Sequence, residues 1–316
     1  MPSDESSPAD TPRPALVLGG GGAYGVIQAA YMLAAWDLGF RPRMVVGTSV
    51  GALNGAWFAL HPERPVELLR IWLSLDELAL VRWHPVRIAA NLLHHPQSIA
   101  SNEVVPKLVR EHMSGARFED AELELAVVAT NLTKGAKHVF RAGSIPRAVL
   151  ASTAIPGVFQ PVTVGGDQFV DGCVTATVDM TTAFEMGATE ILAIDLTPPP
   201  PQARPKTALG VLRQSFSILS TATTRAVETC LSGQLPVRVI RPDLSGNSPW
   251  KLDDSAGAVA HNLRLAREGL AGVFDREGHV APEGTCWMEP AEAGTQDDAP
   301  AGPARYFGRA GWRKAG

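Results

Sequence analysis

The sequence predicts an α/β fold with a largely parallel central sheet. Short runs of apolar, often β-branched residues alternate with longer segments of helical spacing over most of the chain. Two of these runs, ending at Leu18 and Val46, pass through glycine-containing turns into helices, which is the order of a strand–turn–helix unit. Strands that alternate with helices usually pair in parallel, and the helices pack on the sheet as separate layers.

Composition is typical of a globular protein. The 316 residues are 45% hydrophobic and 19% charged, which is enough to bury a sizeable core. With 28 basic and 32 acidic residues and no long run of Lys or Arg, nucleic acid is not an expected partner. The three cysteines are far apart and form no Cys-x-x-Cys pair, which argues against a disulfide framework and a zinc site. We expect a cytoplasmic protein with no metal and no cofactor.

The segment from Ala15 to Trp36 has no charged residue over 22 positions, as a membrane span would. Four consecutive glycines lie inside it, and each costs a helix about 1 kcal/mol relative to alanine, so a spanning helix is not expected. Acidic residues precede the segment where a secretory signal has basic ones. These features favour a soluble protein, and peripheral contact with a membrane stays open.

Both ends of the chain differ in composition from the rest. Residues 1–14 are rich in Ser, Pro and Asp, and residues 282–316 are rich in Gly, Ala and Pro. We therefore predict a disordered N-terminal tail, one folded domain over residues 15–281, and a C-terminal tail of low order.

A glycine-rich loop follows the first predicted strand and precedes a helix over residues 26–38. Its pattern Gly20-x-Gly22-x-x-Gly25 matches a dinucleotide-binding fingerprint, which also needs an acidic residue about 20 positions further on. The next strand ends in Gly-Thr-Ser instead, so a nucleotide site is disfavoured. The backbone N–H groups of Gly20, Gly21 and Gly22 can instead converge on a negative oxygen. We interpret the loop as an oxyanion hole.

The next strand ends in the pattern of a nucleophile elbow. Residues 44–46 are apolar, residues 47–51 read Gly-Thr-Ser-Val-Gly, and residues 52–60 are helical. Such a turn holds its serine, here Ser49, in a strained conformation with the hydroxyl outward. The flanking residues must be small because strand and helix approach each other, and Gly47 and Gly51 satisfy this requirement. A chance turn of small residues is the alternative.

Residues 65–113 are predicted to be helical in pieces separated by prolines. Several large apolar side chains lie between residues 78 and 93, and they have two interpretations. They form ordinary core packing, or they form a flap that lines an acyl pocket and meets a lipid surface. The side chains concerned are Leu78, Leu80, Trp83, Ile88, Leu92 and Leu93.

A second candidate for chemistry follows strands predicted over residues 123–130 and 137–140 and a helix over residues 145–151. Asp171 ends an apolar run, as Ser49 does, and Gly172 leaves room for another group to approach. A turn aspartate that binds its own backbone is the simpler alternative.

The rest of the chain continues the alternation of helices and strands. Segments with helical patterns cover residues 180–187, 209–231 and 256–274, and apolar runs typical of strands cover residues 191–194 and 237–240. His261 lies in the last helix and His279 in a loop, with no motif around either. Only one strand precedes the elbow, whereas ordinary α/β-hydrolases with a Ser-His-Asp triad have several. A histidine-based triad is therefore disfavoured.

With these residues in place, the chain resembles the bacterial patatin-like phospholipases. The glycine loop at residues 20–25, the elbow at residues 47–51 and Asp171-Gly172 occur in the family's order, and residues 151–161 look like the family's sequence before its aspartate. The resemblance covers about Ala15 to Ile194. It implies a three-layer α/β/α fold and a Ser–Asp dyad that hydrolyses acyl esters of lipids without histidine or metal.

Carried over residue by residue, the resemblance implies that Ser49 is the nucleophile and Asp171 the base. The backbone of Gly20, Gly21 and Gly22 would form the oxyanion hole, with the N–H of Val50 added from elbow geometry. The remaining motif residues are Gly25, Gly47, Gly51 and Gly172. The alternative is a degenerate member that binds lipid or a protein partner, and the intact motifs favour the hydrolase.

Three positions depart from the family's usual sequence. Tyr24 stands in place of Lys or Arg, Cys173 in place of Gly or Ala, and Thr177 with Asp179 in place of Asn-x-Pro. None of these changes removes a catalytic atom. The change at Tyr24 bears on how the glycine loop or an anionic headgroup is anchored.

Overall fold

The computed structural model of the protein describes residues 11–75, 78–79, 97–98, 104–199, 204–245, 251–252 and 255–281. Most of the hypothetical flap, residues 80–93, lies outside the described residues, as do residues 1–10 and 282–316. The fold begins slightly before the expected boundary at residue 15. The first strand starts at Pro14, and Arg13 forms an ion pair with Glu124 at 2.7 Å.

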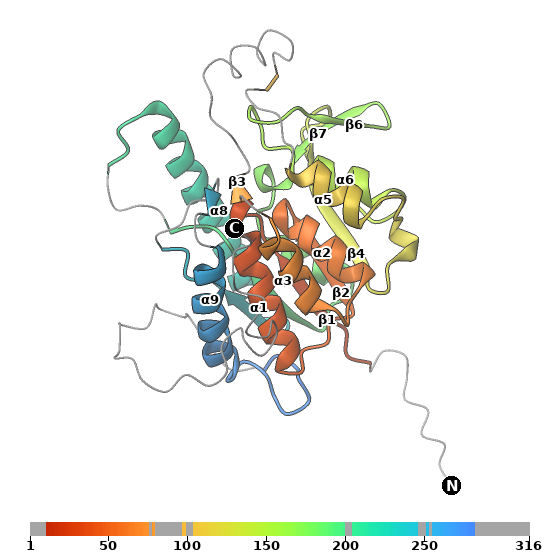
Figure 1. Ribbon diagram of the computed structural model, residues 1–316, viewed down its shortest axis with the longest axis vertical. Helices are drawn as coiled ribbons and strands as arrows, with labels where there is room; N and C mark the ends of the chain where they lie inside the picture. The colour runs from red at the N-terminus through yellow and green to blue at the C-terminus, as the bar shows by residue number, and fades with distance from the viewer. Residues whose placement is uncertain are drawn as a thin grey trace.

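The described chain alternates between strands and helices as the sequence predicts (Figure 1). The strands are β1 (Pro14–Leu18), β2 (Met44–Thr48), β3 (Leu78–Ala79), β4 (Glu124–Asn131), β5 (Ala136–Phe140), β6 (Val162–Val164), β7 (Asp167–Asp171), β8 (Glu190–Ile194), β9 (Val237–Ile240) and β10 (Lys251–Leu252). The α-helices are α1 (Gly25–Asp37), α2 (Val50–Leu60), α3 (Pro65–Leu73), α5 (Val104–His112), α6 (Ile145–Ser152), α7 (Met180–Glu185), α8 (Ala208–Ser232) and α9 (Ser255–Leu270). Short 3-10 helices include η2 (Gly22–Tyr24), η3 (Phe118–Asp120) and η4 (Gly172–Val174).

The main sheet has the order β6-β7-β4-β2-β1-β8-β9, and β5 pairs with β4 beside this path. The run β4-β2-β1-β8-β9 is parallel, whereas β5, β6 and β7 are antiparallel to their neighbours. The sheet is therefore mixed but largely parallel, which confirms the predicted fold class. Strand β1 lies inside the sheet, because β2 and β8 pair with its two edges.

Helices cover both faces of the sheet, and the strands alternate their side chains between them. In β1, Leu16 and Leu18 join the larger core cluster, which includes residues of α1, α2, α3 and α9, while Ala15 and Val17 join the cluster with α7. Figure 1 shows α1, α2, α3 and α9 gathered on one side of the sheet. Two apolar faces covered by separate layers of helices give the predicted α/β/α arrangement.

Candidate active site

The sheet brings the ends of β2 and β7 together on one edge of β4. Residues Val127 and Val128 of β4 pair with β2 and with β5, so these two strands lie on opposite edges of β4. Further along, Ala129 pairs with β5 and with Asp171 of β7, so β7 lies on the same edge as β2. Since β7 runs antiparallel to β4, its carboxyl end meets that of β2. Ser49 and Asp171 therefore approach each other head to head.

The turn after β2 has the backbone of a nucleophile elbow. Ser49 has φ 56° and ψ −124°, and it is the only non-glycine residue with positive φ in the part of the chain that the structure describes. A Cβ on Gly47 would collide with the backbone of Gly51, and a Cβ on Gly51 would collide with the carbonyl of Leu18. Both glycines are thus needed for close approach of β2, α2 and the glycine loop.

Ser152, at the end of α6, fixes this turn. The Ser49 N–H donates to Ser152 Oγ at 2.8 Å, and Ser152 Oγ donates to the carbonyl of Val128 at 2.6 Å. All of these groups are buried, so each hydrogen bond satisfies a group that water does not reach. Ser152 lies in the stretch 151–161, to which the sequence analysis assigned no role.

The serine hydroxyl and the aspartate carboxylate are in direct contact. Ser49 Oγ donates to Asp171 Oδ2 at 2.5 Å, and the Cys173 N–H donates to Asp171 Oδ1 at 2.9 Å. Both residues are buried, with 6% of Ser49 and 3% of Asp171 exposed. Burial raises the pKa of Asp171, while the hydrogen bonds from Ser49 and Cys173 oppose that rise. A carboxylate with a raised pKa is a stronger base.

Gly172 allows Asp171 to lie this close to the elbow. A Cβ at position 172 would collide with the carbonyl of Val128 and would lie 2.9 Å from Thr48 Cγ2. The carbonyl of Asp171 accepts a hydrogen bond from Thr130 Oγ1 at 3.0 Å. The backbone on both sides of the carboxylate is thus packed against β4 and β2.

The glycine loop lies next to this pair, with one difference from the sequence-based expectation. A Cβ on Gly20 would lie 3.0 Å from Ser49 Cβ and would collide with Cys173 Sγ. The N–H of Gly20, however, donates to the carbonyl of Thr177 at 3.2 Å. The Gly20 N–H thus has a partner in this structure, whereas the sequence predicts that all three loop glycines provide donors to the oxyanion hole.

The remaining candidate donors are the N–H groups of Gly21, Gly22 and Val50. Gly22 and Val50 are the first residues of η2 and α2, where N–H groups have no partner within their own helix. Among the described residues, none accepts a hydrogen bond from the N–H of Gly21. The start of α2 also provides a partial positive charge beside Ser49.

A buried polar network holds both ends of the glycine loop. Gln28 Nε2 donates to the carbonyl of Gly19 at 3.0 Å, and Asn54 Nδ2 donates to the carbonyl of Gly25 at 2.9 Å. Asn54 Nδ2 also donates to Gln28 Oε1 at 3.0 Å, and Trp72 Nε1 donates to Asn54 Oδ1 at 2.7 Å. This network joins α1, α2 and α3 to the loop, and none of the sequence motifs indicates it.

Replacing Asn54 with leucine is expected to destabilise the protein by about 1–3 kcal/mol, because the indole N–H of Trp72 would be buried without an acceptor. The free energy of unfolding from urea denaturation measures this effect. Trp72→Phe removes the orphaned N–H but leaves a cavity of its own, so the loss in the double variant should be smaller than the sum of the two single losses. Strictly additive losses in the double variant would show that the two side chains are not coupled.

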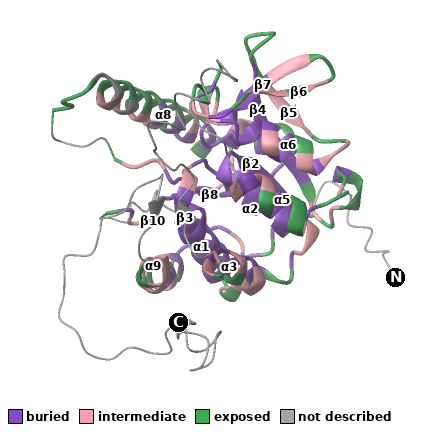
Figure 2. Ribbon diagram, turned by 45° about the horizontal axis from the view of Figure 1, so that its top comes forward, coloured by how far each residue is buried: buried purple, intermediate pink, exposed green. Residues whose placement is uncertain are grey.

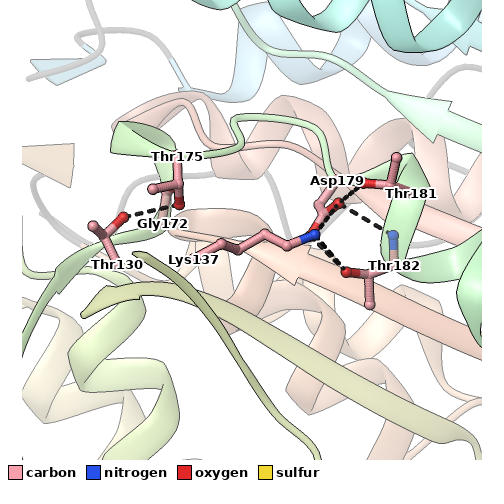
Figure 3. Close-up of polar contacts among 7 residues, drawn as sticks. All are labelled: Thr130, Lys137, Gly172, Thr175, Asp179, Thr181 and Thr182. Carbon is pink, nitrogen blue, oxygen red and sulfur yellow. Dashed lines mark hydrogen bonds and ion pairs between the residues drawn. The ribbon is translucent and has the colours of Figure 1, made fainter. Parts of the chain in front are cut away.

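A second cluster holds the segment after Asp171 (Figure 3). Lys137 of β5 contacts Asp179 Oδ2 at 2.9 Å, and Asp179 also accepts from Thr181 Oγ1 at 2.6 Å and Thr182 Oγ1 at 2.7 Å. Burial alone would raise the pKa of Asp179, but these hydrogen bonds and Lys137 lower it. Asp179 is the N-cap of α7, and its side chain accepts a hydrogen bond from the N–H of Thr182. The aspartate that stands where the family usually has the proline of Asn-x-Pro therefore caps this helix.

Neither His261 nor His279 hydrogen-bonds to Ser49 or Asp171, because each contacts another carboxylate. His261 of α9 contacts Asp243 at 3.0 Å, and His279 contacts Glu190 at 3.0 Å. His279 therefore lies at the start of β8, because Glu190 is the first residue of that strand. The glycine loop lies beyond the other end of β8, where the Gly19 N–H donates to the carbonyl of Ile194. In the described residues, no group of three or more His, Cys, Asp or Glu could hold a metal ion.

None of the helices that the structure describes has both the length and the apolar character of a membrane span.

The family model and the curated relatives match a little over half of the chain. The patatin-like phospholipase family model matches residues 16–184. Over 181 residues the chain is 27% identical to lysophospholipase NTE1 of Aspergillus terreus, a match covering 57% of this chain and 12% of that protein. It is 30% identical over 184 residues to patatin-like phospholipase domain-containing protein 7 of Rattus norvegicus, covering 58% and 13%.

An uncharacterized NTE family protein of Mycobacterium bovis is 28% identical over 189 residues, which cover 60% of this chain and 50% of that protein. The matches thus span between about an eighth and a half of these relatives. Among solved structures, VipD from Legionella pneumophila superimposes with a TM-score of 0.47 and 14% identity, covering 81% of this chain and 65% of VipD.

Proposed function

The chain belongs to the patatin-like phospholipase family, whose model matches residues 16–184, and from this premise we propose that it hydrolyses carboxylic esters of lipids through Ser49 and Asp171. The observation that carries the proposal is the 2.5 Å hydrogen bond from Ser49 Oγ to Asp171 Oδ2 at a strained elbow. A buried serine hydroxyl bonded to a carboxylate of raised pKa is a nucleophile paired with a base.

In the first half of the reaction, Ser49 Oγ attacks the ester carbonyl carbon while its proton moves to Asp171. The negative charge that develops on the carbonyl oxygen is stabilised by the N–H groups of Gly21, Gly22 and Val50. A single donor of this kind typically lowers the barrier by ~3 kcal/mol. The C–O bond to the leaving alcohol then breaks, the alcohol takes the proton from Asp171, and an acyl group remains on Ser49.

In the second half, water attacks the acyl-serine and gives its proton to Asp171. The fatty acid leaves, and the proton returns to Ser49 Oγ, which restores the starting state. Cys173 supports Asp171 throughout, because its N–H binds the carboxylate oxygen that does not contact Ser49. Neither histidine nor metal takes part in these steps.

The proposal is tested by measuring fatty acid release from phosphatidylcholine, from lysophosphatidylcholine and from a short-chain soluble ester. Two relatives carry the names lysophospholipase and phospholipase, so one-chain and two-chain phospholipids are chosen as the first substrates to test. In parallel, the site of labelling by a fluorophosphonate is mapped by mass spectrometry. We expect acid release and a label on Ser49. Lipid that binds without turnover, together with an unlabelled Ser49, would favour the lipid-binding alternative.

A further inference from the structure

The outward side of α8 carries an unusual group of apolar side chains. Five large apolar residues lie within its first turns, and between 43% and 68% of each is exposed. They are Val211, Leu212, Phe216, Ile218 and Leu219, and we call them the α8 apolar face. Figure 2 shows α8 at the margin of the molecule, with much of its surface exposed.

The opposite side of α8 is the one that packs on the protein. Ser220, Thr224, Glu228 and Leu231 recur at intervals of three and four residues and are buried. Beyond Ala222 the exposed residues are mostly polar or small, including Thr223, Arg225 and Thr229. The exposed large apolar residues are thus confined to the first half of the helix. Single exposed apolar residues are normal, but a contiguous group of this kind marks an interaction surface.

Hydrogen bonds connect α8 to the candidate active site. Ser220 Oγ donates to Thr177 Oγ1 at 2.5 Å, and the carbonyl of Thr177 accepts the N–H of Gly20 at 3.2 Å. Leu212 precedes Ser220 by eight residues, a distance of about 12 Å along a helix. Val174, three residues after Asp171, is also 38% exposed. The end of the α8 apolar face at Leu219 therefore lies next to the residue that connects α8 to the glycine loop, and Leu212 lies further out along the helix.

The charge of this part of the chain is one-sided. Residues 196–227 contain Arg204, Lys206, Arg213 and Arg225 but no acidic residue. Arg204 and Lys206, which precede α8, are exposed. Apolar side chains flanked by basic residues match the two components of an anionic lipid surface, the acyl region and the negative headgroups. A second copy of the chain would instead bring like charges together in a symmetric contact.

We propose that the α8 apolar face docks on an anionic phospholipid surface and holds the glycine loop next to it. The proposal rests on the proposed function, which requires a lipid to reach Ser49. In the docked state, Leu212 and Leu219 enter the interface between headgroups and acyl chains, and Arg204 and Lys206 contact phosphates. A lipid then moves only a short distance from the surface to Ser49.

The test is flotation of the full chain with vesicles of phosphatidylcholine, with or without phosphatidylglycerol. We expect binding to the anionic vesicles that weakens at high salt, where charges are screened. The double variant Leu212→Ser/Leu219→Ser should bind at least about tenfold more weakly, because it loses two inserted apolar side chains. Circular dichroism verifies its fold. The control is Leu132→Ser, which removes a leucine that is 48% exposed between β4 and β5 and should bind like the wild type.

Flotation requires no turnover, so its outcome does not depend on whether Ser49 is a nucleophile. The proposal is overturned if the wild-type protein does not float, if it binds both vesicle types equally, or if the double variant binds as the wild type does. It is also overturned if gel filtration shows a wild-type dimer that the double variant converts to a monomer. That result would assign the α8 apolar face to a second copy.

Discussion

Replacement of Ser49 by alanine is expected to lower ester hydrolysis by about 10⁴- to 10⁶-fold, the loss typical of a missing serine nucleophile. The variant keeps Cβ, so the strain of the elbow, with φ 56° at this residue, is unchanged. It also keeps the backbone N–H that donates a hydrogen bond to Ser152 Oγ. Because only the hydroxyl is lost, the protein should fold and bind substrate while the covalent step is abolished. Hydrolysis of a short-chain soluble ester is the appropriate measurement.

Labelling by a fluorophosphonate provides the second measurement for Ser49→Ala, and it should disappear. Ser74→Ala is the matched control, since Ser74 is an exposed serine whose hydroxyl donates only to the carbonyl of Ile71 among the described residues. It should keep both activity and labelling. Residual labelling at another serine in folded Ser49→Ala, together with retained hydrolysis, would disprove the assignment of the nucleophile.

The local units of the site could be predicted from sequence because they depend on local patterns. The strand, the Gly-Thr-Ser-Val-Gly turn and the following helix are contiguous, and only glycine fits at positions 47 and 51. The contact between Ser49 and Asp171 depends instead on the direction of β7. An apolar run ending in Asp-Gly does not indicate whether its strand is parallel or antiparallel, so the head-to-head arrangement on β4 could not be derived from it.

The supporting residues were missed for a related reason. Gln28 and Asn54 lie in segments with the apolar pattern of ordinary helices, and a polar residue there gives no sign of its partner. Consecutive glycines predict three exposed donors, yet the N–H of Gly20 donates to the carbonyl of Thr177, which is distant in sequence. Likewise, the sequence pattern suggests contact with lipid at residues 78–93, as one of two interpretations, and indicates only a helix over residues 209–231. Exposure, which distinguishes the α8 apolar face, is a property of the folded chain.

Replacement of Asp171 by asparagine is expected to reduce turnover by about 10²- to 10⁴-fold, the contribution typical of a general base. Asparagine has nearly the same shape: its oxygen can accept from the Cys173 N–H while its NH2 donates to Ser49 Oγ, but it cannot take the proton. The fold should not suffer, because a buried carboxylate is replaced by a neutral group whose burial costs less. His261→Ala is the matched control: its side chain is 43% exposed and contacts Asp243, so activity should remain. Loss of activity in folded His261→Ala would favour a histidine-based mechanism.

The pH dependence of kcat/KM tests the role of Asp171 more specifically. The carboxylate must be ionised to act as a base, so activity should be lost as the pH falls through its pKa. Burial raises that pKa, so the loss on the acid side should occur at a higher pH than for an ordinary aspartate. In Asp171→Asn the residual activity should no longer show this acid limb. If the limb persists unchanged in the variant, another group provides the base, and the pairing of Ser49 with Asp171 serves only to position the serine.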